Sequence, residues 1–269
     1  MESGLQPASV KWWGAFDIPM GQVALWRIGP LNLWVQRLPG EWRFTQRLEE
    51  DGFDASVGID LTAAQPDERE TDAVHRFGFS TDDTRLVLTP LCADRHVISR
   101  PEKPFTIPPG EESVLYVGTP LWIRIEAGNR KTFLTDMPIV QPSDTWVGES
   151  TREGDLCYAS RTRCRLHLEG FPFHPHRGTT AVTLQNHADS PLALERLNLP
   201  VVHLALHRKE DGNLWTDDVR FERTGAGDMV ELKLGDNWKQ TPKNAELVAA
   251  PREPVNRNLM FRAFSSLFN

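Results

Sequence analysis

Residues 154–178 read GDLCYASRTRCRLHLEGFPFHPHRG and hold two cysteines and three histidines among arginines and leucines. This composition fits a metal site, a catalytic cluster or a β-strand. From Leu156 to Glu169 the side chains alternate, and successive side chains of a strand point to opposite faces. The predicted core face is Leu156, Tyr158, Ser160, Thr162, Cys164, Leu166 and Leu168, and the predicted polar face is Cys157, Ala159, Arg161, Arg163, Arg165, His167 and Glu169. We therefore predict a strand over this stretch.

The strand prediction argues against a shared metal site or disulfide. Cys157 and Cys164 are seven residues apart, so they fall on opposite faces of a straight strand. Cys157 and His167 share a face but lie roughly 33 Å apart at about 3.3 Å per residue. Zinc needs ligands at about 2.0–2.3 Å. We expect Cys164 to be a small buried apolar side chain.

The polar face is the strongest candidate for binding. Arg161, Arg163, Arg165 and His167 recur about 6.7 Å apart along one strand. Acidic side chains on neighbouring strands could form ion pairs with these arginines, as in exposed cross-strand ladders. Alternatively the face binds an anion or an acidic partner, because guanidinium groups suit carboxylate and phosphate.

Two histidine pairs are weaker candidates for metal ligands. His174 and His176 form an H-x-H pair like the one that opens a cupin metal motif, but Thr180 stands where that motif has glutamate. We expect these two to be exposed turn histidines. His203 and His207 in HLALH would suit a helical chelate, yet Val202, Leu204 and Leu206 alternate with them. That pattern predicts a strand, in which the two imidazoles are roughly 13 Å apart.

Carboxylates cluster just before this strand. The segment DTWVGESTREGDLCY contains Asp144, Glu149, Glu153 and Asp155 near Trp146. Paired carboxylates beside an aromatic ring suit glycoside chemistry if about 5–10 Å apart, so Glu149, Glu153 and Asp155 are weak catalytic candidates. Acid-rich turns between strands are the alternative. The chain lacks the nucleophile elbow, phosphate-binding glycine loop and dinucleotide fingerprint, and we predict no cofactor.

The rest of the chain predicts a mainly β protein with antiparallel β-sandwich architecture, as two packed β domains or one extended sandwich. Twenty prolines and nineteen glycines separate short apolar runs, as in sandwiches and barrels. GQVALWRIGPLNLWVQRLPGEWRF predicts a meander with strands ending near Ile28, from Leu31 to Arg37, and from Glu41 to Phe44. We expect domains over residues 1–140 and 141–254. VNRNLMFRAFSSLF, residues 255–268, has helical spacing, so we predict that residues 255–269 form an amphipathic helix that packs on its own domain or on a partner.

Charge and cysteine content narrow the possible partners. Residues 49–72 hold nine acids against Arg69, a charge of −8 within a chain of net charge −7. This segment predicts a solvated acidic loop, and the remaining chain lacks the basic excess expected for nucleic-acid binding. No apolar run is long enough for a transmembrane helix. Three cysteines, and a start without the pattern of a secretory signal, lead us to expect reduced thiols and a cytoplasmic protein.

Several stretches carry a family resemblance. These are WWGAFDIPMGQVALWRIGPLNLWVQRLPGEWRF, VLYVGTPLWIRI, DTWVGESTREGDLCYASRTRCRLHLE, LALERLNLPV and NLMFRAFSSLF. Together they resemble the uncharacterised prokaryotic family called domain of unknown function 432, over about residues 12–268. The resemblance implies one full-length family unit and brings no activity, cofactor or catalytic residue.

The leading hypothesis is a non-catalytic protein that binds an anionic ligand or another macromolecule through its basic strand face and terminal helix. Two alternatives remain open. One is a hydrolase on a carbohydrate or related small molecule, and the other is a structural subunit of an assembly.

Overall fold

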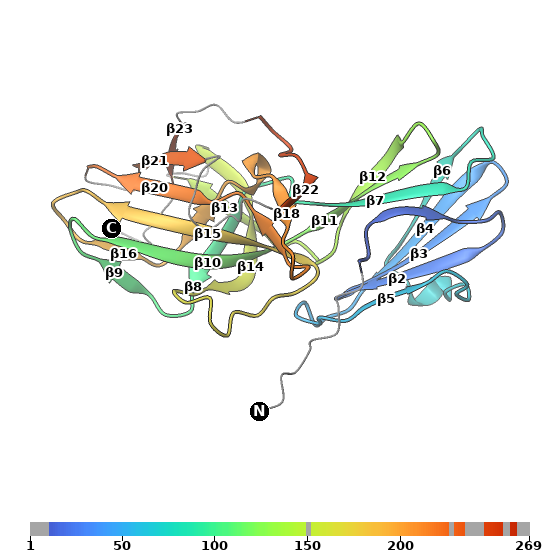
Figure 1. The fold of residues 1–269 in the computed structure, drawn as a ribbon, viewed down its shortest axis with the longest axis horizontal. Coiled ribbons are helices and arrows are strands. Elements are labelled where there is room, and N and C mark those ends of the chain that lie inside the picture. The colour runs from blue at the N-terminus through green and yellow to red at the C-terminus, as the bar shows by residue number, and fades with distance from the viewer. Residues whose placement is uncertain (1–10, 149–151, 226–228, 235–244, 255–258, 263–269) are drawn as a thin grey trace. The chain divides into compact units, whose positions relative to one another are not determined.

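The computed structural model describes residues 11–148, 152–225, 229–234, 245–254 and 259–262. These residues form strands β1–β23 and two short 3₁₀ helices, η1 (Glu68–Glu70) and η2 (Val201–His203) (Figure 1). The prediction of a mainly β protein with several antiparallel sheets is confirmed. Among the described residues no helix is long and apolar enough to cross a membrane.

The chain forms two compact units. Unit 1 comprises Met1–Leu91, Trp122–Gln141 and His174–His176, and unit 2 comprises Cys92–Leu121, Pro142–Phe173 and Arg177–Asn269. The units are therefore interleaved in sequence. The reason is long-range pairing, since β10 (Glu112–Pro120) pairs along its whole length with β15 (Arg177–Asn186).

Unit 1 contains two antiparallel sheets. One has the order β5-β2-β3-β4-β6 and the other β1-β7-β11-β12. The first is built from β2 (Val23–Ile28), β3 (Leu31–Leu38), β4 (Glu41–Leu48), β5 (Val57–Asp60) and β6 (Ala73–Gly78), and the second from β1 (Gly14–Asp17), β7 (Arg85–Leu91), β11 (Trp122–Ala127) and β12 (Thr132–Pro138). The predicted meander is confirmed as β2, β3 and β4.

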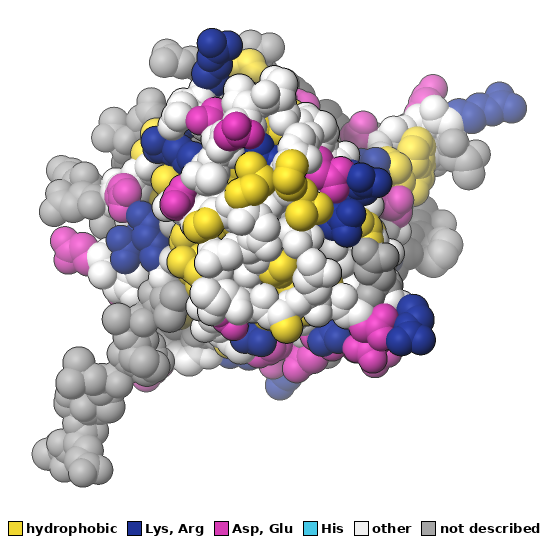
Figure 2. Space-filling view, turned by 90° about the vertical axis from the view of Figure 1, so that its right-hand side faces the viewer, with side chains coloured by type: hydrophobic (Ala, Val, Ile, Leu, Met, Phe, Trp, Pro, Cys, Tyr) yellow, Lys and Arg dark blue, Asp and Glu magenta, His cyan; other side chains and the backbone are white. Residues whose placement is uncertain are grey.

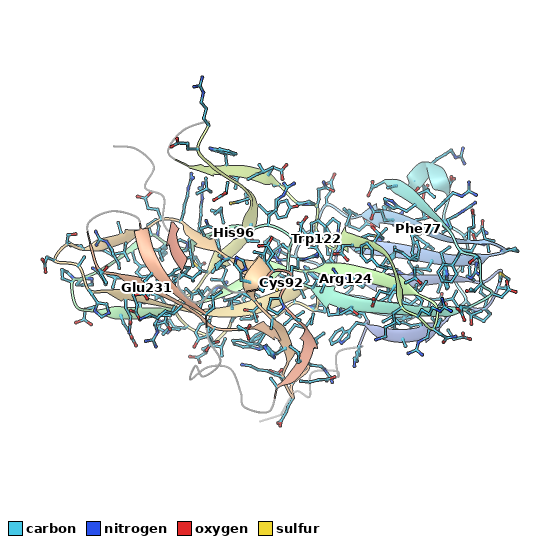
Figure 3. All side chains as sticks on the ribbon, turned by 90° about the horizontal axis from the view of Figure 1, so that it is seen from above. Phe77, Cys92, His96, Trp122, Arg124 and Glu231 are labelled. Carbon is cyan, nitrogen blue, oxygen red and sulfur yellow. The ribbon has the colours of Figure 1, made fainter. Side chains whose placement is uncertain are left out.

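The core of unit 1 follows from alternation along these strands. On β11, which carries Trp122 and Arg124 (Figure 3), Ile123 and Ile125 are fully buried. Phe16 of β1 meets Trp26 of β2 edge to face, with ring centroids 5.0 Å apart. Apolar residues of period two thus fill the interior of unit 1.

The acidic segment 49–72 is more ordered than the predicted loop. Its residues Val57–Asp60 form β5, which pairs antiparallel with β2. Asp67 caps η1 by accepting from the backbone of Arg69, and Asp72 accepts from Leu48 N at 2.6 Å. These carboxylates bond to backbone groups that strand ends and turns leave open.

Unit 2 contains an eight-stranded sheet, a four-stranded sheet and a two-stranded sheet. The first is ordered β22-β18-β19-β15-β20-β21-β23, with β10 also on β15, the second β13-β14-β8-β17, and the third β16-β9. Their remaining bounds are β8 (Val97–Pro101), β9 (Phe105–Ile107), β13 (Asp144–Gly148), β14 (Gly154–Cys164), β16 (Leu192–Leu194), β17 (Leu197–Leu199), β18 (Leu206–Arg208), β19 (Leu214–Thr216), β20 (Val219–Arg223), β21 (Met229–Leu234), β22 (Glu246–Ala249) and β23 (Leu259–Arg262).

Unit 2 also contains parallel strand pairs. β14 runs parallel to β8, and β15 runs parallel to β20 and β19. Residues 177–182 of β15 are all buried, as is typical of strands covered on both faces. Parallel neighbours need long crossovers, which local turn signals do not reveal.

The terminal segment also differs from its prediction. Where a helix was expected over residues 255–269, Leu259–Arg262 form β23, antiparallel to β21 with Val230 opposite Phe261. The remainder of that segment lies outside the described residues. Periodicity cannot separate a short apolar strand from a helix, and the backbone groups of β21 offer β23 a hydrogen-bonding partner.

Candidate functional site

The predicted strand at the centre of the cluster exists as β14, from Gly154 to Cys164. It ends earlier than expected, because Leu166–Glu169 leave the sheet in a bend and turn. Tyr158 and Cys164 are buried as predicted, at 8% and 1% exposure. Cys157, placed on the polar face by the alternation, is also fully buried, and Leu156 is 43% exposed.

The pairing of β14 with β8 is irregular beyond Ala159. Ala159 pairs with Ile98 and Arg163 pairs with Arg100. Residues 160–162 of β14 therefore lie opposite Ser99 alone, which is an irregularity of the bulge type. The failure of strict alternation at Leu156 and Cys157 lies before this irregularity.

The register brings arginines of β14 and β8, and one arginine just before β17, into one row. Arg163 of β14 is the Cα partner of Arg100 on β8. On the other side of β8, Leu197 of β17 pairs with Ser99, and continuing this register by one residue brings Arg196 beside Arg100. Adjacent strands are about 4.8 Å apart. We call Arg163, Arg100 and Arg196 the arginine row.

The positive charges of Arg100 and Arg196 oppose each other. Burial lowers the pKa of Arg196, and the positive charge of Arg100 lowers it further, against an opposing effect of Glu195. Arg100 is exposed. In the described part of the chain, no acidic side chain forms an ion pair with Arg100 or Arg196. Cross-strand acids therefore do not neutralise the row at these two positions.

The other residues predicted for this face are placed differently. Arg165 lies just after β14, where its Nε is 3.5 Å from Glu102 Oε2 and its Nη1 donates to Gly170 O at 2.9 Å. Arg161 falls within the register-shifted part of β14. His167 is exposed and lies beyond the strand end. The sequence analysis proposed Arg163 but not Arg100 or Arg196, because a local sequence pattern does not reveal the pairing of distant segments.

The carboxylate candidates flank the β13–β14 hairpin. Glu149 lies outside the described residues, whereas Glu153 and Asp155 are exposed. Asp155 is the partner of Val147 in the hairpin, and Asp144 pairs with Arg95 at 3.1 Å. The glycines Gly148 and Gly154 face each other so closely that a Cβ on Gly148 would lie 2.1 Å from Glu153 O. The catalytic role of these acids stays a prediction.

A histidine cluster beside β8 was missed by the sequence. His96 directly precedes β8 in unit 2 (Figure 3), and its ring centroid is 6.1 Å from that of His203. Burial lowers the pKa of His96, as does the charge of His203, while Asp155 and Glu253 act in the opposite direction. Segments around residues 96, 155, 203 and 253 contribute to this cluster, so no local sequence motif predicts it.

His174 and His176 are not the exposed turn histidines that the sequence predicts. His176 is fully buried in unit 1, with Nε2 3.2 Å from Gly52 O. His174 is half-buried, with its ring 5.5 Å from that of His176. Thr180, at the position of the missing motif glutamate, instead shares a 2.7 Å hydrogen bond with Thr216. The prolines of this segment indicate a turn, but they do not predict that other residues bury it.

His203 and His207 have separate partners. His203 ends η2 rather than lying in a strand, and its Nδ1 is 3.4 Å from Glu253 O. His207 lies on β18 and places Nε2 2.8 Å from Asp217 Oδ1. Across the described ranges, no group of three or more His, Cys, Asp or Glu side chains could hold a metal ion.

Comparison with known proteins places this architecture in a family. The model of the family described as "Protein of unknown function (DUF432)" matches residues 12–269. No curated protein matches the chain. No solved structure matches it either. Because the family model covers nearly the whole sequence, the chain belongs to the DUF432 family of proteins of unknown function.

Proposed function

We propose that this protein is a non-catalytic binding protein that recognises carboxylate or phosphate groups through the arginine row of unit 2. The observation that carries the proposal is the register that sets Arg163 directly opposite Arg100. Like charges opposite one another across a sheet are destabilising. Repulsion between the arginines lowers the stability of the folded protein, and a bound anion would reduce that repulsion.

The chemistry of the row suits an anionic partner. Arginine stays charged even where its pKa is lowered, and its planar donors match carboxylate and phosphate oxygens. Ser99, which follows Ile98 and precedes Arg100, is fully buried, so the row lies on a strand held by the core. Binding groups on a rigid strand are more precisely placed than groups on a loop.

The arginines named in unit 1 form ion pairs, whereas Arg100 and Arg196 of the arginine row form none with the described residues, and this difference supports the choice of site. Figure 2 shows a face of the molecule on which acidic and basic side chains lie next to each other, with hydrophobic side chains between them. Unit 1 also contains many ion pairs, such as Arg76 with Glu41 and Arg124 with Asp136. The basic groups named there are therefore already partnered.

We also infer the finer organisation. Unit 1 fits a β-sandwich, because its two sheets meet through the contact of Phe16 with Trp26. All three cysteines, Cys92, Cys157 and Cys164, are free and buried, which supports a reducing compartment such as the cytoplasm.

Charge reversal tests the proposal. Arg163→Glu and Arg100→Glu should each weaken binding of tripolyphosphate and of poly-L-glutamate by at least about tenfold, since a repulsive charge replaces an attractive one. Isothermal titration calorimetry at low and moderate salt measures this, and binding to the unaltered protein should weaken with salt. The matched control is Arg130→Glu, on the exposed turn between β11 and β12. Equal binding by the control and the two row variants would refute the proposal.

A further inference from the structure

We propose that a small cavity on unit 1 binds the ring of a single neutral sugar residue. The cavity has a volume of about 140 Å³ and opens on one face of the sheet β5-β2-β3-β4-β6. The cavity and the arginine row involve different residues and different kinds of ligand, so a test of one proposal does not decide the other.

Three adjacent strands build the floor of this cavity. Trp34 of β3 is the cross-strand partner of Thr45 on β4, and Gln36 is the partner of Arg43. Val23 of β2 pairs with Gln36 on the other side. Residues two apart on a strand share a face, so these side chains all project from one side of the sheet. Gln65 and Pro66, from the acidic segment, complete the lining.

Two of the lining side chains are polar, buried and unpartnered. Gln36 is 8% exposed and Thr45 is 4% exposed. No described residue of the chain forms a hydrogen bond with the amide of Gln36 or the hydroxyl of Thr45. Neither is among the described side chains with a fully buried, unbonded polar atom, so the polar atoms of both are open to the cavity. Both side chains line the same cavity, so one ligand can bond to both.

The arginine that lines the cavity already has an acidic partner. Arg43 lies 3.4 Å from Glu41 Oε1, and Glu41 also binds Arg76. Those arginines lower the pKa of Glu41, so it stays ionised and paired with them at neutral pH. An anionic ligand would have to compete with Glu41. A ligand without charge fits better.

The amide of Gln36 and the hydroxyl of Thr45 favour a ligand that carries hydroxyl groups. The amide of Gln36 and the hydroxyl of Thr45 can each donate and accept hydrogen bonds. They therefore match a ligand with neighbouring hydroxyl groups, which also donate and accept. Trp34 provides an apolar wall suited to the C–H face of a ring, and Arg47 lies 5.9 Å from its ring centroid. A cavity of about 150 Å³ holds one six-membered carbon ring. One pyranose ring, with its outer hydroxyls directed to the opening, meets these requirements.

The test is a titration followed by NMR. D-glucose, D-galactose, D-mannose and N-acetyl-D-glucosamine are added singly, and the indole N–H signal of Trp34 is assigned with a Trp34→Phe variant. We expect at least one sugar to move this signal in a saturable way. Cyclohexanol, which has a ring of the same size but a single hydroxyl, should leave it unmoved. If none of the sugars shifts the signal, or if cyclohexanol alone does, the proposal is overturned.

Variants separate binding from folding. Thr45→Val and Gln36→Leu should weaken sugar binding about tenfold each, corresponding to the loss of one hydrogen bond. Their melting temperatures should stay close to that of the unaltered protein, because neither substitution breaks a hydrogen bond among the described residues. Thr45→Ser keeps the hydroxyl and should retain binding, and Thr132→Val on exposed β12 serves as the matched control. Unchanged binding by Thr45→Val and Gln36→Leu would contradict the proposal.

Discussion

Arg37 shows how much a single residue can hold together in this fold. It is fully buried on β3, and its guanidinium donates to Asp83 O at 3.0 Å and to Glu41 O at 2.8 Å. It also bonds to the carbonyl groups of Leu38 and Thr81. The rings of Trp42 and Phe79 lie 5.2 and 5.6 Å from its central carbon. One side chain thereby ties the β3–β4 hairpin to the loop before β7.

Replacing Arg37 by methionine should destabilise unit 1 by about 3 kcal/mol or more. Methionine fills part of the volume but leaves four carbonyl groups without their donor, and each unsatisfied buried group costs about 1–3 kcal/mol. Urea denaturation followed by tryptophan fluorescence measures the change. Arg130→Met, on an exposed turn, should change stability by less than about 0.5 kcal/mol. A loss below about 1 kcal/mol for Arg37→Met would show that these bonds are not important for folding.

Residue-level sequence reasoning succeeded where neighbours along the chain decide the outcome. It placed Tyr158 and Cys164 in the interior, and both are buried. It failed for His176, which is buried against Gly29, where a Cβ would lie 2.3 Å from the imidazole Nδ1. Residues 29 and 176 are far apart in sequence, so no local pattern could indicate that contact.

At the scale of elements, β14 and β23 mark what periodicity can and cannot establish. Alternation over residues 156–164 identified β14, because a period of two belongs to strands. The pairing that produced the arginine row could not be read, since the register shift between Ala159 and Arg163 depends on β8. For residues 259–262 the same apolar spacing fits a helix or a strand, and pairing with β21 decides it.

Removal of β23 should cause association. Truncation after Pro254 replaces the four-residue edge strand β23 by the six-residue β21, and a longer row of unpaired backbone groups on an edge strand promotes aggregation. Size-exclusion chromatography should show aggregates for this variant. Truncation after Arg262 keeps β23 and should elute like the full chain. If the shorter variant remains a soluble monomer, β23 is dispensable for covering that edge.

For the whole molecule, the two units are built from interleaved segments that local patterns cannot assign. Composition and turn residues established the mainly β class, because they act locally. Unit membership depends on pairings such as β10 with β15, which join segments about sixty residues apart in sequence. The histidine cluster at His96 and the arginine row both arise from such pairings, so neither was predictable.

Stability should fall in mild acid because of His96. The pKa of His96 in the folded protein lies below its ordinary value of 6.5, mainly through burial. Below pH 6.5 the unfolded chain therefore binds more protons than the folded one, and stability decreases as pH falls until the folded-state pKa is passed. Above pH 6.5 this residue contributes no pH dependence.

Chemical denaturation at several pH values between 8 and 5 measures this effect. His96→Gln removes the titrating group and should flatten the decline, whereas His187→Gln, a change at a histidine whose side chain is exposed, should not. Parallel curves for His96→Gln and the unaltered protein would assign the acid sensitivity to other groups.

The most direct measurement of the central claim is the unfolding free energy of Arg100→Glu. If Arg163, Arg100 and Arg196 repel one another across β14, β8 and β17, this change replaces repulsion by attraction. It should raise stability by about 0.5 kcal/mol while binding of tripolyphosphate weakens by at least about tenfold. A variant that is less stable than the unaltered protein, or that binds the anion as tightly, would contradict the account.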